Sequence, residues 1–112
     1  MTKQELNIIT GNFVEGLKEL FRDSLKGVIL YGSYARGDFD EESDIDVAIL
    51  VDVKENKFHH YRTLVSRAAD RADWDYNTLL SPIMVNYAEF EKHKAYAPFY
   101  SKVDREGVRL LA

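Results

Sequence analysis

Apolar residues recur every three or four positions near the start of the chain, which is the spacing of one face of an α-helix. These positions are Leu6, Ile9, Phe13, Leu17, Leu20 and Phe21. Thr2 is followed three residues later by Glu5, the pattern of a capping box at a helix N-terminus. We therefore predict a helix from Thr2 to about Ser24, closed by Gly27. Gly11 is the position where this helix is most easily interrupted.

The next two apolar stretches have the pattern of neighbouring β-strands. Residues 28–31, Val-Ile-Leu-Tyr, form a short β-branched and aromatic run that stops at Gly32. Residues 44–53 then alternate, with Ile45, Val47, Ile49 and Val51 on one face. Residues 32–43 show little periodicity and form the connection. Because this connection is a loop without room for a helical crossover, we expect the two strands to be antiparallel.

The second half of the chain predicts one more strand between helices. Apolar spacing indicates an amphipathic helix over 58–73, and residues 76–85 form a third apolar run in which Pro82 marks a sheet edge or an irregular stretch. Asn86 is a candidate N-cap for a short helix over 87–93, and another short helix begins at Pro98 and ends at Gly107. The helical crossover makes the second and third strands parallel.

These elements, in the order α-β-β-α-β-α-α, predict one domain over residues 1–112. We expect an α/β domain of the α+β kind, with a small three-stranded mixed sheet and helices packed on one side. The composition, 46% hydrophobic and 30% charged, is that of a globular protein, and the absence of cysteine excludes disulfides and thiolate metal sites. No apolar run reaches membrane-spanning length, and the N-terminus lacks a signal-peptide pattern, so we expect a cytoplasmic protein without a membrane partner.

Charge is concentrated in one short segment. Six acidic residues and no basic residue fall between positions 38 and 46, whereas the rest of the chain carries 13 acidic and 15 basic residues. A nucleic-acid-binding protein normally shows a basic stripe, so nucleic acid is an unlikely direct partner. A cluster of carboxylates favours a divalent cation instead.

Two short patterns within this region carry candidate chemistry. Gly32-Ser33 follows a strand, where glycine allows a sharp turn and a following helical turn offers N–H groups to phosphate; a plain tight turn is the alternative. Asp44 and Asp46 are two apart in a strand, so both carboxylates leave the same face and can share a Mg²⁺ ion; the alternative is that they only solvate the start of the strand. Meeting at one sheet edge, the two patterns indicate a site for Mg²⁺ and a nucleotide.

Both patterns resemble the signature of the DNA polymerase beta-like nucleotidyltransferase superfamily, in its minimal nucleotidyltransferase branch. The matching residues are Gly32-Ser33-x-Ala35-Arg36-Gly37-Asp38 and, four residues later, Ser43-Asp44-x-Asp46-Val47. The match is close over residues 28–51, and the remaining elements agree in order and length. The resemblance implies a nucleotidyltransferase fold, phosphate binding by Gly32 and Ser33, Mg²⁺ binding by Asp44 and Asp46, and support of the loop or the triphosphate by Arg36 and Ser43.

The chain departs from the family pattern at the third carboxylate, which relatives usually carry on the following strand. Residues 76–85 contain no acid, and Asp75 is the nearest candidate. The parallel geometry places the start of that strand at the active edge, so Asp75 is the candidate third catalytic residue beside Asp44 and Asp46. The alternative is a solvated residue in a helix-to-strand connection.

The resemblance also implies a reaction and a partner. We expect transfer of a nucleoside monophosphate, AMP from ATP, to an acceptor hydroxyl on another protein. Many relatives pair with a small helical HEPN ribonuclease as its antitoxin, and some transfer AMP to it. The aromatic residues near the C-terminus, Tyr87, Phe90, Tyr96, Phe99 and Tyr100, either pack on the sheet or offer a surface to such a partner. The alternative function is a catalytically weak, nucleotide-binding antitoxin that neutralises its toxin by contact alone.

Overall fold

The N-terminal helix begins at the predicted capping box. In the computed structural model, which describes residues 1–112, α1 runs over Lys3–Phe21. Thr2 Oγ1 accepts a hydrogen bond from the Glu5 amide at 3.0 Å, and the Glu5 carboxylate accepts one from the Thr2 amide at 2.9 Å. The helix continues through Gly11 without a break. A short 3₁₀ turn, η1 (Arg22–Ser24), then leads into the sheet.

The sheet has four strands, not the predicted three. The strands are β1 (Leu25–Tyr31), β2 (Ile45–Val51), β3 (Leu80–Asn86) and β4 (Val108–Leu111), in the spatial order β3-β2-β1-β4. Antiparallel pairing of β1 with β2 and parallel pairing of β2 with β3 confirm both predicted directions. The additional strand β4 pairs antiparallel with β1.

Five helical segments connect and cover these strands. They are α2 (Ser33–Arg36), the 3₁₀ segment η2 (Glu55–His60), α3 (Arg62–Asp73), α4 (Tyr87–His93) and α5 (Pro98–Glu106). The predicted N-cap is confirmed, because Asn86 Oδ1 accepts a hydrogen bond from the Glu89 amide at 2.9 Å. None of the helices combines the length and the apolar character that crossing a membrane requires.

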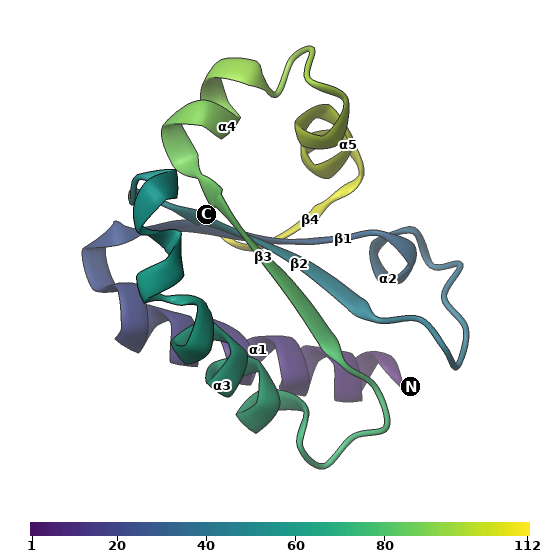
Figure 1. Cartoon of the computed structure of the whole chain (residues 1–112). Helices are drawn as coiled ribbons and strands as arrows, with labels where there is room; N and C mark the ends of the chain where they lie inside the picture. The colour runs from purple at the N-terminus through teal and green to yellow at the C-terminus, as the bar shows by residue number, and fades with distance from the viewer.

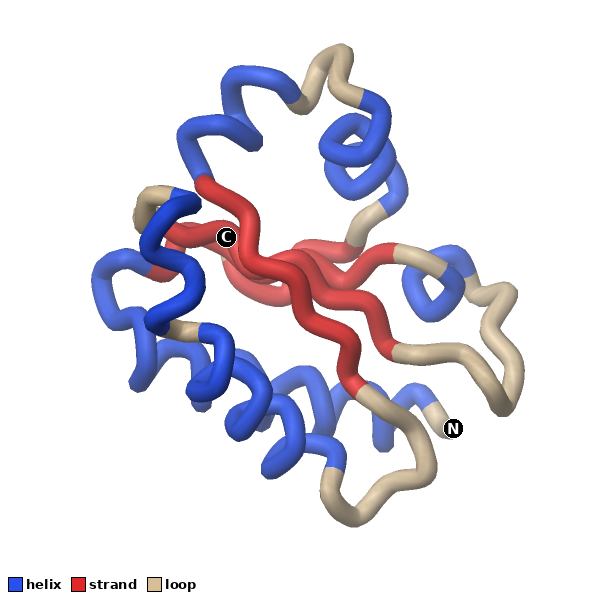
Figure 2. The backbone as a smooth tube through the Cα atoms, viewed as in Figure 1, coloured by secondary structure: helices blue, strands red, loops and turns tan.

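Helices lie on both faces of the sheet, which corrects the prediction of one helical face. Figures 1 and 2 show α1 and α3 below the sheet and α4 and α5 above it. The lower layer forms the larger core, with Phe13 and Leu17 fully buried. The upper layer forms a smaller core in which α4 and α5 supply one deeply buried residue each, Phe90 and Val103. Because each of these helices buries only one residue deeply, the sequence did not indicate that a second face of the sheet is covered.

Two glycines predicted to end helices have other roles as well. Gly27 lies inside β1 rather than closing α1, and a β-carbon there would approach Leu50 Cδ1 at 3.2 Å. Gly107 does end α5, and its amide donates a hydrogen bond to the Val103 carbonyl at 2.9 Å. Its backbone is extended, so the requirement for glycine there is space: a β-carbon would collide with Ile29 and the Val103 carbonyl.

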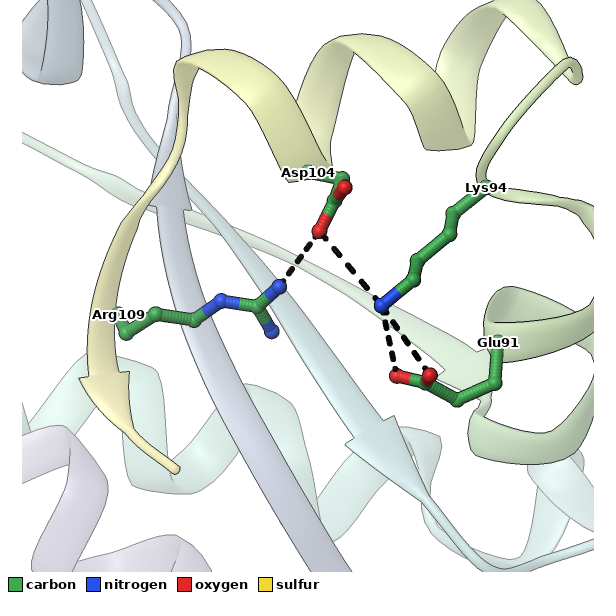
Figure 3. A network of polar contacts seen from close by, with 4 residues as sticks. All are labelled: Glu91, Lys94, Asp104 and Arg109. Carbon is green, nitrogen blue, oxygen red and sulfur yellow. Dashed lines mark hydrogen bonds and ion pairs between the residues drawn. The ribbon is translucent and has the colours of Figure 1, made fainter.

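An ion-pair network joins the last three elements of the chain (Figure 3). Asp104 of α5 accepts a hydrogen bond from the Arg109 guanidinium of β4 at 2.6 Å. The Lys94 ammonium, just after α4, lies 4.0 Å from Asp104 and 3.1 Å from Glu91. The network therefore lies on the side of α5 that faces α4 and β4.

Candidate active site

Three strand ends meet at one edge of the sheet, as the predicted strand directions require. The last residue of β1, Tyr31, pairs with Asp46 of β2, and Asp46 pairs with Ser81 of β3. Asp46 lies on the upper face of the sheet, the face shared by Ala48 and Leu50, because side chains two apart in a strand share a face. The site therefore lies at this edge, on the side that α5 covers.

Gly32 turns the chain from β1 into α2 directly against Asp46. Its φ of +75° and ψ of −154° define a conformation open almost only to glycine. A β-carbon at Gly32 would occupy the space of the Asp46 carboxylate. The predicted glycine turn and the predicted acidic pair are therefore packed against each other.

The short helix α2 holds Ser33 at its first position. The Gly32 carbonyl accepts hydrogen bonds from the amides of Ala35 at 3.1 Å and Arg36 at 3.0 Å, which closes the turn. The amides of Ser33 and Tyr34 come too early in the helix to have an intrahelical acceptor. They are donors of the kind that an anionic oxygen accepts from, next to the Asp46 carboxylate.

Neither Asp44 nor Asp46 takes part in an ion pair. Asp44 is exposed and Asp46 is half-buried. Burial raises the pKa of the Asp46 carboxyl above its usual range, and the neighbouring Asp44 charge raises it further, whereas Arg36 and Lys102 act in the opposite direction. A bound cation would offset the repulsion between the two carboxylates, which is the second cause of this raised pKa after burial.

The pair fits a hard divalent cation in its donor atoms. Carboxylate oxygens are the ligands that Mg²⁺ prefers, and the missing β-carbon of Gly32 leaves room beside the Asp46 carboxylate. No group of three histidine or acidic side chains in the structure could hold a metal ion. Asp44 and Asp46 would therefore be its only acidic ligands, with water or a substrate phosphate completing the shell.

The structure does not bring Asp75 into a cluster with this pair. The third strand begins at Leu80 instead of residue 76, because the buried Asp73 carboxylate accepts a hydrogen bond from the Leu80 amide at 2.9 Å and closes the intervening residues into a loop. Asp75 lies in this loop and lines a cavity of about 500 Å³ with Tyr34 and Phe39. Its role as a third carboxylate stays a prediction.

Arg36 and Ser43 make contacts of different kinds. Arg36 Nε donates a hydrogen bond to Asp38 at 3.2 Å, and its Nη1 lies 3.9 Å from the Glu106 carboxylate of α5. Ser43 Oγ accepts a hydrogen bond from the Asp40 amide at 3.0 Å, so it closes the acidic loop on itself. Arg36 thus lies between the glycine turn and α5, whereas Ser43 shapes the connection that leads into β2.

Sequence reasoning missed the contribution of α5. Phe99 packs edge-to-face on Tyr31 with ring centroids 5.6 Å apart, and Tyr31 is the strand partner of Asp46. Burial raises the pKa of the Tyr31 hydroxyl, and the Asp46 charge raises it further. Lys102 is the second cation that acts on Asp46. The helical spacing of Phe99 and Lys102 was visible in the sequence, but nothing local indicated where that helix would dock.

Comparisons with known proteins agree with the motif. Residues 11–110 match a family model described as a nucleotidyltransferase domain. A candidate protein adenylyltransferase of Methanocaldococcus jannaschii is 37% identical over 106 residues, which cover 95% of this chain and 99% of that relative. A second protein of the same organism and description is 58% identical over 41 residues, or 37% of this chain and 41% of that relative.

A solved structure supports the likeness of fold. The crystal structure of a candidate nucleotidyltransferase from Sulfolobus solfataricus aligns with a TM-score of 0.55 and 21% sequence identity. The alignment covers 97% of this chain and 87% of that chain. The two chains therefore share an overall fold.

Proposed function

Since the chain belongs to the nucleotidyltransferase domain family, we propose that it transfers AMP from ATP to a hydroxyl group of a partner protein in a Mg²⁺-dependent reaction. The observation that carries this proposal is the contact between Gly32 and Asp46. It puts a turn with free amides, suited to phosphate oxygens, beside a pair of carboxylates suited to the metal that accompanies a nucleoside triphosphate.

The choice of AMP and of a protein acceptor is supported by the relatives. The relative that matches over almost its whole length is described as a candidate protein adenylyltransferase, as is the second.

The acidic pair and the first amides of α2 have distinct roles in the proposed reaction. The acceptor oxygen forms a bond to the α-phosphorus, the bond from that phosphorus to the bridging oxygen breaks, and pyrophosphate leaves. Asp44 and Asp46 would hold Mg²⁺, which when bound offsets charge on the phosphate oxygens. The amides of Ser33 and Tyr34 bind phosphate oxygens, and the hydroxyl proton of the acceptor passes to a base or to water.

The proposed biological partner rests on the resemblance of the motif to minimal nucleotidyltransferases, many of which pair with a HEPN ribonuclease. We propose a small helical ribonuclease of the HEPN type, with this protein acting as its antitoxin and modifying a hydroxyl side chain near the partner's active site. An added AMP brings negative charge and bulk to a site that must receive RNA phosphate, so it would block the partner. Silencing by contact alone, without transfer, is the second candidate function, and the lack of a third acidic ligand favours it.

Co-expression of the two proteins tests this proposal. We expect the partner to gain the mass of one AMP by intact mass spectrometry, and purified protein to transfer label from α-labelled ATP to it. The control is the Asp44→Asn/Asp46→Asn double variant, which should transfer no label. A partner that copurifies and is silenced without gaining AMP supports contact alone, and a partner that neither copurifies nor changes mass contradicts both functions.

A further inference from the structure

One row of side chains on α5 faces the candidate site. Phe99, Lys102 and Glu106 are three and four residues apart, so they follow one another along one side of the helix. Phe99 at one end packs on Tyr31, the strand partner of Asp46. Glu106 at the other end lies 3.9 Å from Arg36, beside the glycine turn. Lys102 lies between these two contacts.

The rotation of α5 about its axis is fixed independently of the site. Val103 is 1% exposed and packs in the upper core, and Asp104 is held by Arg109 and Lys94 (Figure 3). These contacts lie on other sides of the helix, so the row that contains Lys102 faces the end of β1. The position of Lys102 therefore follows from the packing of the helix, which contacts β1 directly.

Lys102 is a cation without a partner. Arg36, the other cation near the acidic pair, contacts Asp38 and Glu106. Lys102 takes part in none of the ion pairs of the structure, and its side chain is exposed. Its two neighbours in the row, Phe99 and Glu106, contact Tyr31 and Arg36, so Lys102 faces the end of β1 and the glycine turn. A free ammonium group beside a phosphate-binding turn and a metal-binding pair is well suited to an anionic ligand.

We propose that Lys102 binds the phosphate chain of the nucleotide from the α5 side, opposite the Ser33 turn, so that the C-terminal helix forms one wall of the nucleotide site. This assignment rests on the proposed function. Phosphate oxygens would accept hydrogen bonds from two sides, from the backbone amides of α2 and from the Lys102 ammonium group of α5. Arg36, held by Glu106 in the free protein, contributes its charge at the junction of the two elements.

The strand β4 helps to hold α5 beside the site. The strand β4 returns along β1, and the Arg109–Asp104 contact of 2.6 Å ties this strand to α5. The C-terminal residues therefore help to keep Lys102 near the acidic pair, which lies far away in sequence. Removal of the positive charge should weaken binding of the phosphate chain while the fold stays intact.

The test is calorimetric titration of Mg-ATP and of adenosine into the full chain. We expect Lys102→Met to weaken ATP binding about tenfold or more, and to leave adenosine binding unchanged, because a hydrogen bond to a charged group is lost only with ATP. Lys102→Arg should restore ATP binding to within about threefold, since it keeps the charge. The matched control is Lys92→Met, an exposed lysine of α4 outside the site, which should bind ATP as the unaltered protein does.

The outcomes separate this assignment from the proposed function. If the unaltered protein binds Mg-ATP and Lys102→Met binds it equally well, the assignment to Lys102 is wrong and the proposed function stands. If Lys102→Met weakens ATP and adenosine alike, the side chain is not a phosphate ligand, and the assignment is also overturned. If the unaltered protein does not bind Mg-ATP at all, the proposed function fails and the assignment fails with it.

Discussion

Gly32 lies so close to Asp46 that the space for a β-carbon on the glycine is taken by the aspartate carboxylate. The two residues belong to different strand ends, β1 and β2, and the antiparallel pairing of Tyr31 with Asp46 brings them together. The glycine is therefore required twice, once for its backbone conformation and once for the room it leaves. The glycine turn and the acidic pair consequently form one packed unit.

Gly32→Ala should damage both stability and binding. The backbone conformation alone costs an ordinary residue about 1–3 kcal/mol, and the new methyl group must also displace the Asp46 carboxylate. We expect a loss of at least about 1–3 kcal/mol in the free energy of unfolding, measured by urea denaturation, together with loss of Mg-ATP binding.

Two other glycines serve as matched controls for this variant. Gly37 also has a positive φ, +87°, but a β-carbon there would meet nothing within 4 Å, so Gly37→Ala should show the cost of strain alone, about 1–2 kcal/mol. Gly11 has ordinary helical geometry and open surroundings, so Gly11→Ala should stabilise the protein by up to about 1 kcal/mol. A Gly32→Ala variant that behaves like Gly37→Ala and still binds nucleotide would contradict the role of the close contact.

Removal of either acid of the pair should abolish Mg²⁺-dependent nucleotide binding. Asp44→Asn and Asp46→Asn each remove one of two carboxylate ligands. The affinity for Mg-ATP should therefore fall by more than the roughly 10–100-fold that follows the loss of a residue that only supports a metal ligand. Titration calorimetry with Mg-ATP measures it. The control is Asp52→Asn, an exposed acid just past the opposite end of β2. Unchanged affinity in both site variants would exclude the pair from the site.

The raised pKa of Asp46 predicts how metal-free stability changes with pH. Because the pKa is higher in the folded than in the unfolded chain, ionised Asp46 is unfavourable in the fold at neutral pH, and stability falls as pH rises through this pKa. Asp46→Asn should therefore raise the melting temperature at pH 7 in the presence of a chelator. The gain should disappear below about pH 4, where the wild-type carboxyl is protonated in both states. A gain that is equal at both pH values would point to packing instead of charge.

Asp75→Asn tests whether this residue is a third carboxylate. Asp75 lies in the loop before β3 and lines a cavity with Tyr34 and Phe39, apart from the acidic pair. If Asp75 accepts the acceptor's proton or completes the metal shell, labelled-AMP transfer by the variant should fall by about 100-fold or more at nearly unchanged ATP affinity. Transfer within about twofold of the unaltered protein would leave a site with two carboxylates only.

Phe90→Ala tests the second core that α4 and α5 form above the sheet. Phe90 is 1% exposed, so its truncation should lower the free energy of unfolding by about 3–5 kcal/mol. Trp74, a large aromatic residue that is 80% exposed, is the control, and Trp74→Ala should change stability by less than about 0.5 kcal/mol. Similar losses in the two variants would contradict a packed upper face. Denaturant titration followed by circular dichroism measures both.

Local patterns predicted the elements that build the site. The alternation through Ile45 and Val47 located β2, and the side-chain caps at Thr2 and Asn86 fixed where two helices begin, because each of these signals depends on a few neighbouring residues. The directions of the strands followed from the lengths of their connections. The meeting of the glycine turn with the acidic pair was predictable for the same reason.

Long-range packing decided the features that the sequence did not reveal. Only four residues form β4, and their pairing with β1 depends on the space that Gly107 leaves beside Ile29. The start of β3 is set by the contact of Asp73 with Leu80, seven residues apart across a loop. Lys102 lies near the site only because α5 packs on β1, and the spacing of residues within α5 does not indicate where this helix packs.

Pro82 gives the outer strand of the sheet a further property. Strand β3 is an edge strand, paired with β2 on one side only, and Pro82 lies opposite Val47 within it. Proline has no N–H group, so an additional strand laid along this edge would lack one donor in the middle of its ladder. The edge formed by β3, the outer neighbour of the strand that carries Asp46, is thus a poor template for aggregation by strand addition.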